Sequence, residues 1–108
     1  MKNDYSIKGL FGIAQVADFA KKVKEGSLIL DVRSPAEFEN NHIKGAVNIP
    51  LNTLSKKLNK LKKDKVIITC CASGIRSASA KSILEANRFE SIYNVRGWHS
   101  LNQKIQEQ

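Results

Sequence analysis

The chain has 108 residues, a formal net charge of +8, and an ordinary balance of apolar and charged side chains. This length allows one globular domain with a single core, and no apolar run approaches the about 18 residues of a membrane span. The only cysteines, Cys70 and Cys71, are adjacent. They form no disulfide framework and lack the paired spacing of a zinc site, which leaves thiol chemistry or plain burial.

The N-terminal segment lacks the apolar stretch of a secretory signal. We therefore expect a cytoplasmic protein, although a mature exported form would read the same. Residues 1–12 carry little pattern: Ser6–Lys8 resembles a short edge strand, and Gly9 and Gly12 indicate turns.

A helix and a buried strand are predicted next. Gly26 is placed to end the helix, and the near-continuous apolar run at 27–32 is typical of a strand covered on both faces. The helix itself is indicated by apolar residues at helical spacing, namely Ile13, Val16, Ala17, Ala20 and Val23.

A second helix start follows this strand. Ser34 is suited to the N-cap, Pro35 to the first helical position, and Glu37 to the closing position of a capping box. We expect this helix to stop near residues 40–41 and a brief strand to cover 46–49.

The second half of the chain repeats the alternation of strand and helix. It predicts a strand at 66–70, a helix from 75 or 76 to 87, a strand at 91–95, a turn at Gly97 and a closing helix at 98–106. This order indicates a three-layer α/β domain with a mainly parallel sheet. Before these elements, one helical face is predicted from Leu51, Leu54, Leu58 and Leu61.

Six lysines concentrate opposite that leucine face. We interpret them first as the solvated side of an amphipathic helix. They could also attract small anions or an acidic partner protein. Few arginines and no interleaved aromatic residues accompany them, so nucleic acid is not expected as a partner. A membrane is not expected either, because no apolar run is long enough to span one. The lysines are Lys56, Lys57, Lys60, Lys62, Lys63 and Lys65.

The stretch from Thr69 to Ser77 (TCCASGIRS) has the layout of an anion-binding loop between a strand and a helix. Loop N–H groups and the helix N-terminus point positive dipole ends at one place, and a cysteine held there is expected to be partly thiolate. Asp31 and Arg33 also follow a strand. Because parallel sheets bind ligands beyond the carboxyl ends of their strands, we expect both to meet the loop.

Two parts of the chain together resemble the rhodanese-type sulfurtransferase domains. The first carries DVR at 31–33, EF at 37–38 and HIKGAVNIP at 42–50, and the second carries CASGIRS at 71–77. The resemblance extends from about Ile13 to the last helix. It implies that residues 1–108 form a single rhodanese-like α/β/α domain with about five strands.

The resemblance also implies a reaction. A donor such as thiosulfate would load Cys71 with sulfane sulfur as a persulfide, and cyanide or a thiol would remove it, with no metal or organic cofactor. Arg76 would add charge and orient the donor. The persulfide would be held by the amides of Ala72, Ser73, Gly74, Ile75 and Arg76.

Two positions depart from the family pattern. Arg96-Gly97-Trp98 has one glycine where the family often has two, in the segment that borders the family's substrate pocket. Cys70 stands before the nucleophile, where a bulky residue is common.

Two alternatives remain open. Counted from Cys70, the loop has the Cys-x5-Arg length of cysteine-dependent phosphatases and arsenate reductases, although Thr69 replaces their usual histidine. Alternatively, the chain is a persulfide carrier or protein-binding module without turnover. The loop sequence favours Cys71 and sulfur.

Several other residues have a structural and a chemical interpretation. Cys70 is expected to be buried filler, with a resolving thiol as the alternative. Asp31 and Arg33 are expected to support the site from behind, and Arg33 could equally pair with Glu37. His42 is interpreted as structural, because an ionised thiol needs no base.

The remaining polar and glycine positions lie in or near the loop. Ser73 and Ser77 could donate to an anion or act as caps, and Gly74 is expected to permit a backbone angle that the loop requires. Trp98 is expected to pack, and His99 to lie near the pocket rim.

Overall fold

The computed structural model describes residues 8–107, and their side chains from Val16 onward. The strands are β1 (Leu28–Asp31), β2 (Val47–Asn48), β3 (Ile67–Cys71) and β4 (Ile92–Gly97). The helices are α1 (Lys8–Lys24), α2 (Pro35–Asn40), α3 (Leu51–Leu54), the short 3-10 helix η2 (Leu58–Lys60), α4 (Ile75–Ala86) and α5 (Trp98–Gln106).

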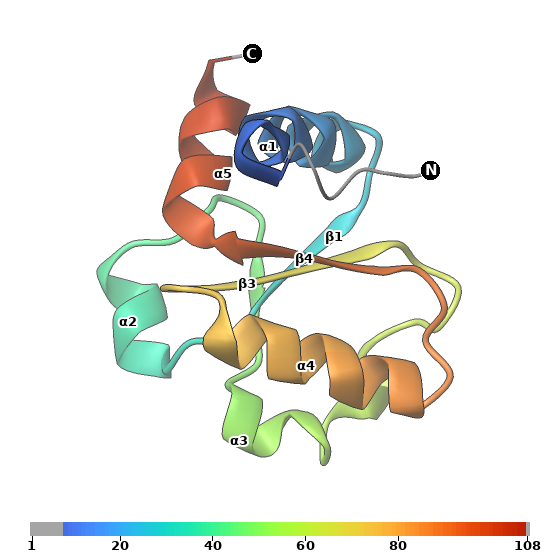
Figure 1. Ribbon diagram of the computed structural model, residues 1–108. Helices are drawn as coiled ribbons and strands as arrows, with labels where there is room; N and C mark the ends of the chain where they lie inside the picture. The colour runs from blue at the N-terminus through green and yellow to red at the C-terminus, as the bar shows by residue number, and fades with distance from the viewer. Residues whose placement is uncertain (1–7, 108) are drawn as a thin grey trace.

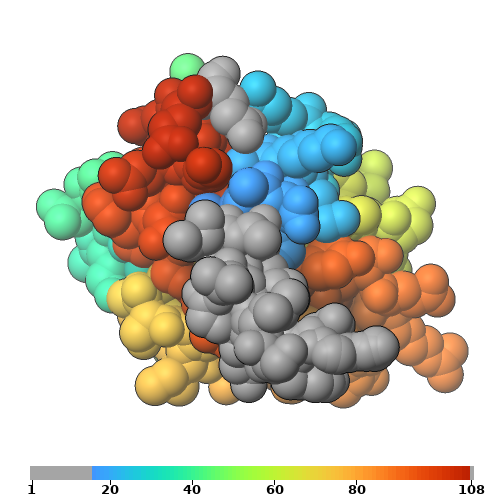
Figure 2. Space-filling view, turned by 45° about the horizontal axis from the view of Figure 1, so that its top comes forward, coloured from blue at the N-terminus to red at the C-terminus, as the bar shows by residue number. Residues whose placement is uncertain are grey.

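The strands form one parallel sheet in the order β2-β1-β3-β4. Helices α1 and α5 cover one face, α3 and α4 cover the other, and α2 lies near the carboxyl end of β3 (Figure 1). Figure 2 shows α5 and α1 side by side on their face of the molecule. The predicted three-layer α/β arrangement with a parallel sheet is confirmed.

The core has one apolar cluster on each face of the sheet. Cys71 belongs to the cluster facing α3 and α4, together with Leu30 and Leu84. Cys70 belongs to the cluster facing α1 and α5, together with Phe19. Because successive side chains of a strand point to opposite faces, the two cysteines are separated by the sheet although they are adjacent in sequence.

Local sequence signals explain the element boundaries around β1 and α2. Gly26 has φ +101, and the Ser27 N–H donates to the Lys22 carbonyl, as in a helix C-cap built on a left-handed residue. Ser34 caps α2 by accepting from the Glu37 amide, while the Glu37 carboxylate accepts from the Ser34 amide. The predicted C-cap and capping box are therefore confirmed.

Some expectations at the N-terminal end are wrong. Helix α1 runs through Gly9 and Gly12, where turns were expected, and includes Lys8, the last residue of the expected edge strand. Ser6 and Ile7 lie outside the described residues. A glycine inside a helix costs about 1 kcal/mol relative to alanine, which a long helix can absorb when it packs on a core.

Other differences concern the number and length of elements. The described residues form four strands rather than about five. The expected leucine-faced helix is two short pieces, α3 and η2, yet its leucines still pack on the core. Strand β4 continues through Gly97, where a turn was expected. Within residues 8–107, no helix combines the length and apolar character needed to cross a membrane.

Candidate active site

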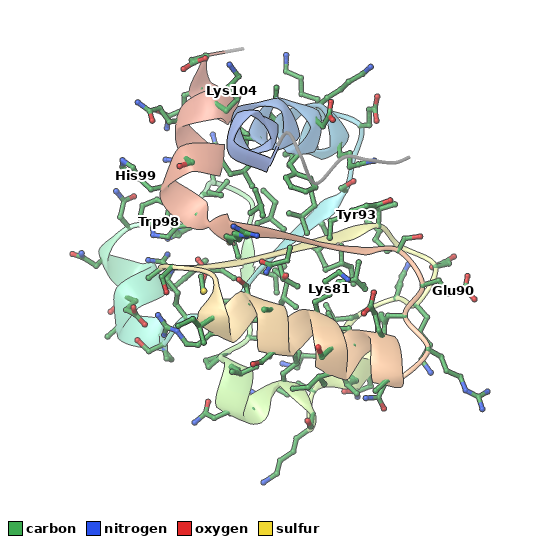
Figure 3. All side chains as sticks on the ribbon, in the orientation of Figure 1. Lys81, Glu90, Tyr93, Trp98, His99 and Lys104 are labelled. Atoms are coloured by element: carbon green, nitrogen blue, oxygen red, sulfur yellow. The ribbon has the colours of Figure 1, made fainter. Side chains whose placement is uncertain are left out.

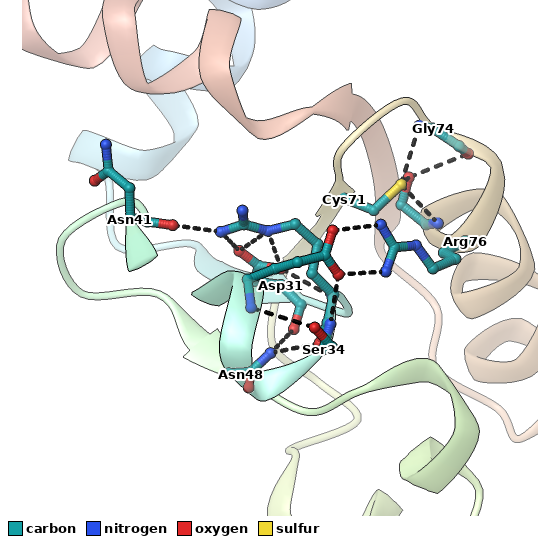
Figure 4. Close-up of polar contacts among 10 residues, drawn as sticks. Asp31, Ser34, Asn41, Asn48, Cys71, Gly74 and Arg76 are labelled. Carbon is teal, nitrogen blue, oxygen red and sulfur yellow. Dashed lines mark hydrogen bonds and ion pairs between the residues drawn. The ribbon is translucent and has the colours of Figure 1, made fainter. Parts of the chain in front are cut away.

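Cys71 ends β3, and the chain then curls around its sulfur before α4 begins. The Gly74 N–H donates to Cys71 Sγ over 3.0 Å, and the Ser77 N–H donates over 3.4 Å. Ser77 Oγ lies 3.3 Å from the same sulfur (Figure 4). Gly74 has φ +111, a left-handed conformation that glycine adopts without strain. The loop therefore forms a cradle for a sulfur anion.

The cradle lowers the pKa of Cys71. Burial of the thiol acts in the opposite direction and would raise the pKa by itself. The hydrogen bonds from the Ser77 hydroxyl and from the amides of Ser77, Gly74 and Ser73 outweigh it, because they stabilise the thiolate. The geometry thus favours an ionised nucleophile at the carboxyl end of the sheet.

The structure places the Ser77 hydroxyl against the Cys71 sulfur, which its position in the sequence did not specify. Its side chain is fully buried, and Oγ lies between Cys71 Sγ and the Gly74 carbonyl, 3.2 Å from the latter. The hydroxyl can donate to the thiolate or, when the sulfur carries a proton, to the carbonyl. The sequence offered a signal in the serine at the helix start, but not the choice between a cap and a sulfur ligand.

The guanidinium of Arg76 forms an ion pair with Glu37 and is therefore not a free cation. Its guanidinium binds both carboxylate oxygens of Glu37, over 2.7 and 3.0 Å (Figure 4). The hydrogen bonds from Arg76 and from the Ser34 amide lower the pKa of Glu37 to about 2, and Glu37 raises the pKa of Arg76. The considered Arg33–Glu37 pair does not form, because the guanidinium of Arg33 binds Asp31 instead.

Asp31 and Arg33 form a buried ion pair behind the cradle. Arg33 Nη2 lies 2.8 Å from the Asp31 carboxylate and 2.7 Å from the Asn41 carbonyl. Asn48 donates to the Asp31 and Arg33 carbonyls. The guanidinium carbon of Arg33 lies 4.6 Å from the centre of the Trp98 ring. These contacts fix the strand ends, and Asn48 was not identified from the sequence.

Cys70 lies on the other side of the sheet. Its thiol is fully buried among apolar side chains, and burial raises its pKa well above the ordinary value, with the nearby Asp31 carboxylate adding to the effect. A buried neutral thiol of this kind is a poor nucleophile. The geometry therefore supports Cys71 as the reactive residue and Cys70 as core filler.

An apolar groove adjoins the loop at Arg76, and the two histidines lie after α2 and at the start of α5. The groove has a volume of about 510 Å³ and is lined by Val32, Pro35, Pro50, Leu51 and Arg76, among others.

His42 stacks on Phe38, and its Nδ1 lies 2.6 Å from the Phe38 carbonyl, which fits a structural role. Figure 3 shows His99 beside Trp98 at the start of α5, on the side of the molecule where α2 lies. In the part of the chain that the structure describes, no cluster of three metal-ligating side chains occurs.

A parallel sheet carrying an activated thiol in a loop of amides at its carboxyl end defines a class of anion-handling cysteine proteins. Comparison with known proteins narrows this class. Residues 15–102 match the family described as Rhodanese-like domain, and the chain belongs to that family.

Relatives and solved structures agree with this assignment. The chain is 42% identical to the uncharacterized protein YqhL of Bacillus subtilis over 64% of this chain and 55% of that protein, so it spans about half of that relative. It is 32% identical to the thiosulfate sulfurtransferase PspE of Escherichia coli, over 83% of this chain and 86% of that protein. A crystal structure of a rhodanese-related protein from Thermoplasma volcanium has a TM-score of 0.71 and 34% identity, covering 85% of this chain and 88% of that one.

Proposed function

We propose that this protein is a sulfurtransferase that carries sulfane sulfur as a persulfide on Cys71. The observation that carries the proposal is the set of donors around one sulfur: the amides of Gly74 and Ser77 and the Ser77 hydroxyl all lie within 3.4 Å of Cys71 Sγ. Such a cradle stabilises negative charge on sulfur, which the reaction places there both before and after transfer.

The proposed donor is thiosulfate or a similar anion. The Cys71 thiolate attacks the sulfane sulfur, a bond forms between the two sulfurs, and the bond to the sulfonate breaks. Sulfite leaves with the electron pair, and the persulfide keeps one negative charge. The similarity to PspE, named a thiosulfate sulfurtransferase, supports this choice of donor.

The proposed acceptor is cyanide or a thiol. It attacks the outer sulfur of the persulfide, and the bond to Cys71 breaks to restore the thiolate. With cyanide the product is thiocyanate. The reaction needs no oxidant, and every proton it involves is supplied by an acceptor thiol. An acidic partner protein is a further candidate acceptor, because the chain carries a net charge of +8.

Thiocyanate formation from thiosulfate and cyanide tests this proposal in the wild type, Cys71→Ser and Cys70→Ala. We expect turnover in the wild type and Cys70→Ala and none in Cys71→Ser. Loss of turnover in Cys70→Ala alone would instead point to the phosphatase-like register, and hydrolysis of a phosphate ester would then be measured.

A persulfide carrier without turnover is the second candidate, and the burial of Cys71 favours it. A fully buried sulfur restricts free collision with small acceptors, whereas a docked partner could approach the cradle directly. Persulfide that forms on Cys71 and is released only to a protein thiol would support the carrier. We expect either activity in the cytoplasm, which fractionation of the source cells would test.

A further inference from the structure

Arg96 occupies a backbone conformation that favours glycine. Its φ is +75, in the left-handed region where a non-glycine residue carries strain of about 1 kcal/mol or more. The register of β4 against β3 shifts at this point, so that Arg96 lies opposite Cys70 and Gly97 opposite Cys71. The Asn94 side chain holds the irregularity by accepting from the Arg96 amide over 2.9 Å. Irregularities of this kind re-aim a side chain, often beside an active site.

The re-aimed side chain lies against the cradle. A Cβ added to Gly74 would stand 3.0 Å from Arg96 Cβ and 3.1 Å from Cγ, so the stem of Arg96 lies directly against Gly74. The Gly74 amide is the donor 3.0 Å from Cys71 Sγ. The stem of Arg96 therefore lies beside the residue whose amide binds the reactive sulfur, and its side chain is exposed.

The other charged side chains near the sulfur are already paired, which distinguishes them from Arg96. Asp31 is paired with Arg33, and Glu37 with Arg76, so both of these pairs are neutral overall. The Cys71 thiolate adds one negative charge that an anionic donor would have to approach. Among the residues that the structure describes, Arg96 has no carboxylate partner. It is thus the cation of the cradle that is free to bind a ligand.

We propose that Arg96 forms an anion subsite that binds the oxyanion end of the sulfur donor. This inference rests on the proposed sulfur transfer and names the residue that selects its donor. Arg96 binds the sulfonate oxygens of thiosulfate while Cys71 attacks the sulfane sulfur. It remains bound to sulfite as the sulfur–sulfur bond of the donor breaks, and it exchanges no proton.

Glycine would adopt φ +75 without strain, and the family pattern often has glycine in this segment. Strain alone does not indicate a function, because Arg88 has a similar φ of 72. The contact with Gly74 of the cradle is what distinguishes Arg96.

Arg88 offers a matched control for this inference. It is also an exposed arginine in the left-handed region, with φ 72. It precedes β4, whereas Arg96 lies near its end. Arg96→Gly and Arg88→Gly therefore remove the same charge and a similar strain, but only one of them alters the cradle.

Steady-state kinetics with two donors tests the subsite. We expect Arg96→Gly to raise the KM for thiosulfate about tenfold, the effect of losing one hydrogen bond between charged groups, with a smaller change in kcat. The rise should be smaller for the singly charged donor methanethiosulfonate. Arg96→Lys should keep part of the affinity, and Arg88→Gly should match the wild type. Equal KM values in Arg96→Gly and Arg88→Gly would overturn the inference.

A binding measurement separates this inference from the proposed function. In a Cys71→Ser protein, which cannot form the persulfide, we expect calorimetry to detect thiosulfate binding that the added Arg96→Gly change weakens about tenfold. Equal binding with and without Arg96 would overturn the subsite. Arg96-dependent binding together with no sulfur transfer in the wild type would uphold the subsite and reject the sulfurtransferase proposal.

Discussion

The ionisation of Cys71 depends on hydrogen bonds to its sulfur rather than on an adjacent cation. The main influences that lower its pKa are the Ser77 hydroxyl and the amides of Ser77, Gly74 and Ser73, which together outweigh burial. The arginine of the loop, Arg76, is bound to Glu37. We infer that the loop arginine stiffens the cradle, while the backbone and Ser77 stabilise the charge.

Ser77→Ala should therefore raise the pKa of Cys71, because it removes a donor to the thiolate. The thiolate fraction at neutral pH falls, and alkylation by iodoacetamide slows, with its pH profile moved to higher pH. Ser79→Ala, an exposed change on the same helix, should leave the profile unchanged. An unmoved profile in Ser77→Ala would contradict the role given to this hydroxyl.

At the residue scale, part of the site was predictable. Cys71 was proposed by counting from Arg76 and by the resemblance of the loop. The special backbone angle expected at Gly74 is confirmed by its φ of +111. The partners were not predictable. Glu37 and Arg76 are 39 residues apart, so their pairing depends on how α2 and α4 pack. The role proposed for Arg96 depends on a shift in strand register that could not be predicted, although the departure of Arg96-Gly97-Trp98 from the family pattern pointed to this segment.

At the scale of elements, one ion pair joins α2 to α4. Glu37 closes the capping box of α2 and binds Arg76 in the first turn of α4. The ion pair requires the ionised carboxylate, whereas the capping-box bond requires only an acceptor oxygen. The position of α2 against the cradle therefore depends on a charge that acid removes.

Acid should weaken this connection in a defined pH range. Glu37 has a folded-state pKa of about 2 against an ordinary value of 4.5, because of Arg76 and the Ser34 amide. The unfolded chain binds the proton first, so the stability contributed by Glu37 is present above pH 4.5 and is lost as the pH falls toward 2.

Thermal unfolding as a function of pH checks this prediction. Glu37→Gln should have a smaller loss of Tm than the wild type between pH 4.5 and pH 2. Glu39→Gln removes an exposed carboxylate of the same helix and should follow the wild-type curve. Parallel curves for the wild type and Glu37→Gln would refute the assigned role.

Helix α4 is fixed to the sheet by apolar burial. Leu84 is fully buried, whereas Ile75 is 78% exposed. Leu84→Ala should reduce the free energy of unfolding by about 2–5 kcal/mol, because it leaves a cavity in the core. Ile75→Ala removes similar volume and should change it by less than about 0.5 kcal/mol. Urea unfolding measures both, and equal losses would show that this packing is misassigned.

Strand and helix positions were largely predictable because buried parallel strands are continuous apolar runs and caps have local signatures. The strand predicted at 27–32 is β1 with slightly shorter bounds, and the closing helix has the predicted bounds. The start of α1 and the break between α3 and η2 were not predicted. Both depend on tertiary packing, which overrides the low helix propensity of glycine and the high helix propensity of lysine.

At the scale of the whole molecule, the sheet separates two thiols that are adjacent in sequence. Cys71 faces α4 and its helix N-terminus, and Cys70 faces α1 and α5. One thiol thereby receives hydrogen bonds that stabilise its thiolate, whereas the other is buried in an apolar cluster near the Asp31 carboxylate. The fold, rather than the local sequence, determines which cysteine we expect to react.

The measurement that most directly tests which cysteine reacts is mass spectrometry of the peptide that carries both cysteines, with fragmentation between them, after treatment with thiosulfate. We predict that one sulfur atom is added at Cys71 in the wild type and in Cys70→Ala, that none is added in Cys71→Ser, and that cyanide removes it. Sulfur found on Cys70, or persisting in Cys71→Ser, would contradict the account.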